Sequence, residues 1–216
     1  MANSFEDAGA AALELNSYEV VTDPDTPASP IEERTLQLVR ELRKALRIPL
    51  AVKLSPYFTA FGNVARKVLR AGADGLVLFN RFYQTDIDID TVEPVHQISL
   101  SPRSELLVRL RWVAILRSRT AASLAVSGGV ATPPDGINAI LAGADAVQLV
   151  SAILRHGPGY FAEMREGLAR WLDGKRFPSV SAVRGRLSLP ADADAGATER
   201  GNYLRLLQTW KADRRT

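Results

Sequence analysis

Residues 122–158 read ASLAVSGGVATPPDGINAILAGADAVQLVSAILRHGP, and this stretch decides the fold of the 216-residue chain. It holds two short apolar runs, 124–126 and 146–150, which predict two neighbouring buried strands. Each run ends in residues with little side-chain bulk, Ser127–Gly129 in the first case and Ser151 in the second. Such turns can present backbone N–H groups to an anion. The stretch therefore predicts the phosphate site that α/β barrels place at their last two strands.

The helix between the two runs has clear boundaries in the sequence. Thr132 is a suitable N-cap, Pro133 suits the first helical position, where no N–H is needed, and Gly143 ends the helix. The same ending occurs at Gly9 and Gly72, where glycine lies in an Ala-Gly-Ala sequence shortly before an apolar run. This repeat indicates helix–strand units that recur along the chain.

Five apolar runs alternate with helical patterns, which favours an α/β fold with parallel strands. The predicted strands cover residues 12–16, 48–54, 75–80, 123–129 and 146–151. The predicted helices cover about 31–46, 60–71, 105–118, 134–142 and 158–173. The runs are continuously apolar, as expected for parallel strands that are covered on both faces. The fold class is therefore the (β/α)8 TIM-barrel type.

Three further segments complete the predicted organisation. Residues 17–30 and 81–104 are long and irregular, and they follow strands at the face where barrel enzymes carry their active sites. The barrel part covers residues 1–178, and a C-terminal tail covers 179–216. The tail contains a helical pattern at 199–210, which we expect to pack on the surface of the body.

Composition narrows the class of protein. Apolar residues make up 46% and charged residues 24%, as in soluble globular proteins. No apolar run approaches the roughly 20 residues of a membrane span, and the first residues lack a signal-peptide pattern. The chain has no cysteine, which excludes disulfides and thiolate metal sites. These features predict a cytoplasmic protein with neither a membrane partner nor a metal site. The net charge of +3 is spread over the helices, so we expect no nucleic-acid partner either.

Polar and small residues lie at the carboxyl ends of all five predicted strands. They are Asn16, Lys53, Asn80, the pair Gly128 and Gly129, and Ser151. Each asparagine alone is also a common turn residue. Lys53 is more informative, because a buried ammonium needs an anionic partner, either a ligand or a carboxylate. The combination at matched positions predicts one binding site on this face.

These residues resemble motifs of the dihydroorotate dehydrogenase family. The matching segments are ELN at 14–16, AVKLSPYF at 51–58, LVLFN at 76–80, FNRFYQ at 79–84, SGG at 127–129 and AGADAVQLVSAILRHGP at 142–158. The resemblance covers roughly residues 8–185, in order and with consistent spacing. It implies an FMN-dependent barrel enzyme of pyrimidine biosynthesis that oxidises dihydroorotate to orotate.

The resemblance also implies roles for individual residues. Lys53 corresponds to the lysine at the pyrimidine edge of the flavin, where positive charge stabilises the reduced cofactor. Gly128, Gly129, Val150 and Ser151 correspond to the groups that hold the FMN phosphate. Asn16 corresponds to an amide near both flavin and substrate, Asn80 to a substrate-binding amide, and Phe79 to a residue near the cofactor.

The sequence departs from the family pattern in two respects. Family members carry a cysteine or serine base in the loop after the ELN strand, whereas Glu19 occupies that position here and Tyr18 precedes it. In addition, the match begins at what would be the fourth of eight strands. The resemblance therefore implies a barrel truncated to strands 4–8, in which five strands cannot close and leave two open edges.

Two other functions remain open on sequence grounds. The chain is either a non-catalytic barrel remnant or another phosphate-binding barrel enzyme, a lyase or isomerase with Lys53 as a Schiff-base amine. The open edges predict either a homo-oligomer or pairing with a missing N-terminal half.

Overall fold

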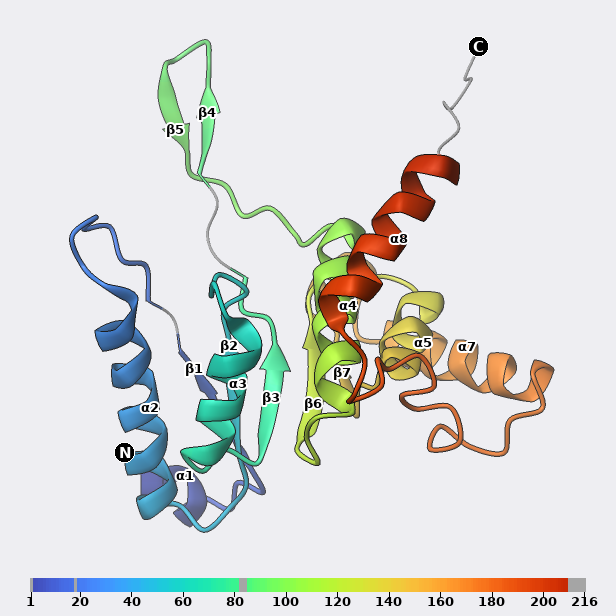
Figure 1. Ribbon diagram of the computed structural model, residues 1–216, viewed down its shortest axis with the longest axis horizontal. Helices are drawn as coiled ribbons and strands as arrows, with labels where there is room; N and C mark the ends of the chain where they lie inside the picture. Colours follow the sequence, from blue (N-terminus) through green and yellow to red (C-terminus); the bar gives the residue numbers. More distant parts are fainter. Residues whose placement is uncertain (1, 18, 82–84, 210–216) are drawn as a thin grey trace.

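The computed structural model describes residues 2–17, 19–81 and 85–209, and its centre is a five-stranded parallel sheet (Figure 1). The strands are β1 (Leu13–Asn16), β2 (Leu50–Leu54), β3 (Gly75–Leu78), β6 (Ser123–Ser127) and β7 (Ala146–Gln148). Their order in the sheet is β1-β2-β3-β6-β7, and all four neighbouring pairs are parallel. The five predicted strands and their parallel arrangement are therefore confirmed.

The helices follow the predicted alternation. They are α1 (Ala2–Asp7), α2 (Ala28–Ala45), α3 (Phe61–Arg70), α4 (Leu106–Arg117), α5 (Pro133–Ala142), α6 (Ser151–His156), α7 (Tyr160–Gly174) and α8 (Ala195–Thr209). Pro133 is the first residue of α5, as predicted, and Gly143 follows its last residue. Gly9, Gly72 and Gly143 all have positive φ, so the glycine repeat marks three chain reversals that other residues adopt with difficulty.

The two faces of the sheet differ, which corrects the expectation of continuously apolar strands except in β3, where all four residues are buried. In β2, Leu50, Val52 and Leu54 are buried, whereas Ala51 and Lys53 between them are only partly buried. The large side chains form the core with the helices that cover the outer face. The inner face carries mostly small and polar side chains, namely Glu14, Asn16, Ala51, Lys53, Gly75, Ala125, Ser127 and Gln148, together with the buried Val77, which is the register partner of Lys53 and Ala125. β1, β2 and β6 therefore alternate between large apolar and small or polar residues, whereas β3 is continuously apolar.

Two similar arginine–aspartate ion pairs lie at the amino ends of the strands. The Asp74 carboxylate accepts hydrogen bonds from Leu50 N–H (2.8 Å) and from Arg43 (2.9 Å), which comes from α2. Asp145 repeats this arrangement with Leu124 N–H (2.8 Å) and Arg117 of α4. The repeated Ala-Gly-Ala-Asp sequence thus ties each strand to its neighbour and to a helix.

Two expectations about the connecting segments were wrong. Residues 81–104 are not wholly irregular, because they include a hairpin of β4 (Asp86–Asp88) and β5 (Glu93–Val95) and the start of the 3-10 helix η1 (Arg103–Glu105). Tail helix α8 does not pack on the body but projects away from the sheet (Figure 1). Its described side chains from Arg200 to Thr209 are exposed, because its leucines have no neighbouring apolar surface to cover them.

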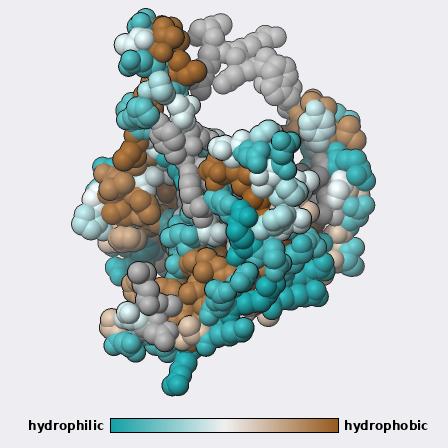
Figure 2. Space-filling view, turned by 90° about the vertical axis from the view of Figure 1, so that its left-hand side faces the viewer, coloured by the Kyte–Doolittle hydropathy of each residue, from teal (hydrophilic) through white to brown (hydrophobic). Residues whose placement is uncertain are grey.

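Within the described residues the sheet does not close into a barrel. β1 and β7 each have one neighbour, and both are only partly buried, unlike the fully buried β3. Figure 2 looks onto the side that carries α2 and shows apolar areas among the polar surface. In the part of the chain that the structure describes, no helix is both long and apolar enough to cross a membrane.

We expect the Asp145→Ala variant to lose about 2 kcal/mol in free energy of unfolding, because Leu124 N–H, Arg117 and Arg184 all lose a charged partner. Urea denaturation followed by circular dichroism measures this loss. Glu166→Ala is the control, because it removes only an exposed pair with Arg170 at 3.7 Å. Equal stability of the two variants would contradict a structural role for Asp145.

Candidate functional site

The predicted site residues lie at the carboxyl ends of the strands, as the parallel topology requires. Asn16 ends β1 and is the register partner of Lys53 in β2. Phe79 and Asn80 directly follow β3, the Gly128–Gly129 pair follows β6, and Val150 and Ser151 stand just after β7 at the start of α6. The structure therefore brings these five chain segments to one face.

Lys53 lies inside the curve of the sheet with two oxygen partners. Its Nζ is 3.3 Å from Glu14 Oε1 of β1 and donates to Gln148 Oε1 of β7, also at 3.3 Å. Gln148 Nε2 in turn donates to Glu14 Oε2 at 2.5 Å. The side chains of Lys53 and Glu14 are 17% and 27% exposed, so their charges are partly desolvated. The carboxylate partner that Lys53 was expected to need is therefore Glu14.

This polar triad of Glu14, Lys53 and Gln148 also reports the shape of the sheet. β1 and β7 are opposite edges in the strand order, yet Glu14 and Gln148 are in hydrogen-bond contact. The sheet is therefore curled enough for side chains from its two edges to meet across the inner face.

The two asparagines and Phe79 have different environments. Asn80 Nδ2 donates to Ser17 O (3.0 Å) and to Lys53 O (3.5 Å), so it joins the chain after β1 to the end of β2. Asn16 is exposed at the strand end. Phe79 is buried and contacts the Phe61 ring edge-on, with 4.9 Å between the ring centroids. Its side chain thus belongs to the core behind the site.

A cluster of polar groups joins the ends of β6 and β7. Ser101 and Ser151 are in contact through their hydroxyl oxygens (2.8 Å), and Ser101 N–H donates to Ser151 Oγ (3.1 Å). Gly129 N–H donates to Ser101 Oγ (3.3 Å). Three separate chain segments thus bring hydroxyl and backbone N–H groups to one point, which we name the serine–glycine cluster.

Arg109 of α4 supports this cluster from behind. Its side chain is 4% exposed, and its guanidinium donates to Ser127 O, to Glu105 O (2.5 Å) and to the Glu105 carboxylate (3.2 Å). Burial lowers the pKa of Arg109, while the Glu105 charge opposes that shift. The contacts hold the turn that contains Gly128 and Gly129 against the start of α4.

Asp135 supports the same turn from α5. Its fully buried carboxylate accepts hydrogen bonds from Ala131 N–H (3.1 Å), from Thr132 N–H (2.9 Å) and hydroxyl (2.8 Å), and from Arg103 (2.6 Å). Burial raises the pKa of Asp135, but these hydrogen bonds outweigh it and hold the pKa below its usual range. The carboxylate therefore stays ionised and fixes the chain after Gly129.

Glu19 lies apart from the triad, in the loop after β1. It forms an ion pair with Arg34 of α2, and its side chain is 40% exposed. It lines a cavity of about 660 Å³ between the loops that follow β1 and β2, together with Ser17, Thr35, Tyr57 and Phe58. Tyr18, the neighbouring candidate base, lies outside the described residues, as do residues 82–84 of the FNRFYQ segment.

Sequence reasoning missed Glu14, Gln148, Ser101 and Arg109. Two of them could have been found from the sequence. Glu14 lies two residues before Asn16 and so on the same face of the strand, and Gln148 interrupts an apolar run. Arg109 lies on the buried stripe of α4 with Leu106, Val113 and Leu116, at helical spacing. Ser101 gave no local signal, since its partner Ser151 is 50 residues away.

Comparisons with known proteins point to one family. The family model described as dihydroorotate dehydrogenase matches residues 9–172. The catalytic subunit of dihydroorotate dehydrogenase B (NAD⁺) from Thermoplasma volcanium is 30% identical over 193 residues, which cover 84% of this chain and 61% of that protein. A putative dihydroorotate dehydrogenase A (fumarate) from Aeropyrum pernix is 32% identical over 197 residues, with coverage of 86% and 61%.

A solved structure shares the fold. The crystal structure of a ligand-free dihydroorotate dehydrogenase (DHODH) from Eimeria tenella superposes with a TM-score of 0.64 at 20% identity, over 88% of this chain and 59% of that one. The chain thus spans about three fifths of the length of these relatives.

We expect Gly129→Ala to destabilise the protein by about 1–3 kcal/mol, because Gly129 has a φ of +77° and an added Cβ would lie 2.4 Å from Leu106 N. Thermal and urea unfolding measure the loss. Gly174→Ala is the matched control, since nothing lies within 4 Å of a Cβ at that position. Similar stabilities of the two variants would show that the turn is not closely packed on α4.

Proposed function

The chain belongs to the dihydroorotate dehydrogenase family, and from this premise we propose that it binds FMN and forms part of an oxidoreductase that converts dihydroorotate to orotate. The proposal rests on two clusters of polar residues that lie near each other in the sheet. The Glu14–Lys53–Gln148 triad lies on the inner face, and the serine–glycine cluster lies at the ends of β6 and β7.

The donor set fits the two ends of FMN. The serine–glycine cluster gathers two hydroxyls and the Gly129 N–H, which bond to one another in this structure, and a phosphate would replace these contacts as the acceptor. The triad offers the Lys53 ammonium and the Gln148 amide, which suit the carbonyl oxygens and ring nitrogens of a flavin edge. Between them, the inner face carries the small residues Ala51, Gly75 and Ala125 together with Val77.

Each residue has a role in this proposal. FMN, when bound, supplies the acceptor for the hydride that leaves dihydroorotate. Lys53 stabilises negative charge at the flavin edge, and Gly129, Ser151 and the neighbouring Gly128 and Val150 hold the phosphate. Asn16 and Asn80 orient the substrate amides. Glu19 takes the substrate proton, which requires it to release Arg34.

The open edges support a second part of the proposal. The unpaired N–H and C=O groups of an edge strand are a template for pairing, and β1 and β7 each have one neighbour among the described residues. We propose that further strands, from a second copy or from another polypeptide segment, pair with these edges and complete the inner face. We also propose that the protein is cytoplasmic.

Flavin titration tests the two ends of the site separately. We expect Lys53→Met to weaken FMN and riboflavin binding alike, by about tenfold, because it removes a contact to the ring. Ser151→Ala should weaken FMN but leave riboflavin unchanged, because it removes only a phosphate donor. Quenching of flavin fluorescence measures both affinities, and circular dichroism confirms the fold. A folded wild-type protein that binds neither flavin would refute the proposal.

The role of Glu19 is tested by anaerobic reduction of the bound flavin with dihydroorotate. We expect Glu19→Gln to slow this reduction by about 10²-fold or more without changing FMN affinity. Asp25→Asn, in the same loop, is the control and should react like the wild type. If the flavin in Glu19→Gln is reduced as fast as in the wild type, another residue is the base. If the wild type binds FMN but dihydroorotate does not reduce it, the dehydrogenase activity is contradicted while FMN binding stands.

A further inference from the structure

A groove of about 730 Å³ lies between α3 and α4, on the outer layer of helices. Its lining includes Arg66, Leu69 and Arg70 from α3 and Ile115, Leu116 and Arg119 from the end of α4 and the residues after it. α3 and α4 flank β3 and β6, which are neighbours inside the sheet (Figure 1). The groove is therefore remote from the free edges β1 and β7, and strands added at those edges would not fill it.

The charged residues that line this groove are all positive. Neither α3 nor α4 contains an aspartate or glutamate, and the groove lining has three arginines and no acid. Neither Arg66 nor Arg70 forms an ion pair in the part of the chain that the structure describes. They are also four residues apart on one helix, so their like charges repel.

Arg119 adds a third positive charge that is held in place. Its guanidinium donates to the carbonyls of Ile115 (2.7 Å), Pro190 (3.4 Å), Ala191 (3.3 Å) and Ala193 (3.3 Å). These neutral acceptors fix the side chain but leave its charge uncompensated. Arg70 and Arg119 lie at helix carboxyl ends, where cations are favourable, but Arg66 lies a full turn earlier and gains nothing from this effect.

We propose that this groove binds a small organic phosphate of nucleotide size. Arginine is the residue best suited to phosphate recognition, because its planar guanidinium donates two parallel hydrogen bonds. Leu69, Ile115 and Leu116 give the groove an apolar floor for the organic part of the ligand. Its volume lies within the usual range of ligand sites, about 300–1,000 Å³. The site is separate from the serine–glycine cluster and does not depend on the FMN proposal.

Binding of adenosine diphosphate, adenosine and pyrophosphate to the full chain, measured by isothermal titration, tests the proposal. We expect ADP to bind more tightly than either fragment, because only ADP uses both the arginines and the floor. The double variant Arg66→Glu/Arg70→Glu should bind ADP at least about tenfold more weakly. Arg165→Glu/Lys175→Glu, with the same change in net charge at exposed positions, should bind ADP like the wild type.

Two further measurements separate this groove from the flavin site. Ser151→Ala should leave ADP affinity unchanged, and Arg66→Glu/Arg70→Glu should leave FMN affinity unchanged and the protein folded by circular dichroism. The proposal is overturned if the wild type does not bind ADP, if the arginine variant binds it as tightly as the wild type, or if Ser151→Ala abolishes the binding.

Discussion

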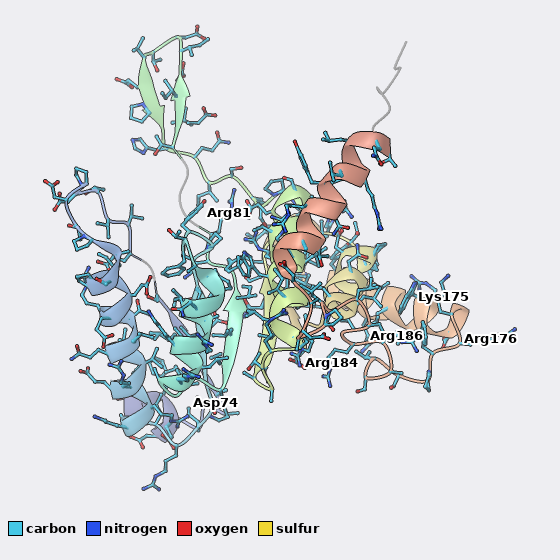
Figure 3. All side chains as sticks on the ribbon, in the orientation of Figure 1. Asp74, Arg81, Lys175, Arg176, Arg184 and Arg186 are labelled. Carbon is cyan, nitrogen blue, oxygen red and sulfur yellow. The ribbon has the colours of Figure 1, made fainter. Side chains whose placement is uncertain are left out.

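The common direction of the five strands is the constraint on which the rest of the structure depends. It puts all amino ends at one side and all carboxyl ends at the other, as Asp74 and Arg81 on either side of β3 show (Figure 3). At the amino ends, Asp74 and Asp145 bind strand N–H groups and arginines, which fixes the spacing of the strands. The carboxyl ends are thereby left to carry polar groups that stability alone does not require.

The triad on the inner face shows what those polar groups cost. Partly burying the Lys53 ammonium is unfavourable, and Glu14 at 3.3 Å offsets that cost, while Gln148 supplies a further acceptor. A leucine at position 53 would leave the partly buried Glu14 carboxylate without its cation, so Lys53 and Glu14 stabilise the face only as a pair. The pair accounts for the charge of Lys53 by itself, and the proposed flavin role of Lys53 therefore rests on its position in the family motif.

The sequence predicted the features that depend on local patterns. Strand and helix alternation, the glycine repeat and the Pro133 helix start all follow from neighbouring residues, and the structure has them. Features that depend on distant contacts were missed, such as the meeting of Ser101 with Ser151 and of Glu14 with Gln148. The prediction that α8 packs on the body was wrong for the same reason. An apolar pattern shows that a helix has an apolar face, but it does not show which other element packs against that face.

The two ends of the proposed flavin site are held by different parts of the sheet. The serine–glycine cluster joins β6, which has neighbours on both sides, to the edge strand β7, and the buried Arg109 and Asp135 support it from behind. The triad depends on β1 and β7, the two strands with a single neighbour each. Both groups therefore include a residue on or directly after β7, namely Gln148 and Ser151, but only the triad also draws on the other edge, β1. Under the FMN proposal, strands that paired with both edges would act on the ring end through two strands and on the phosphate end through one.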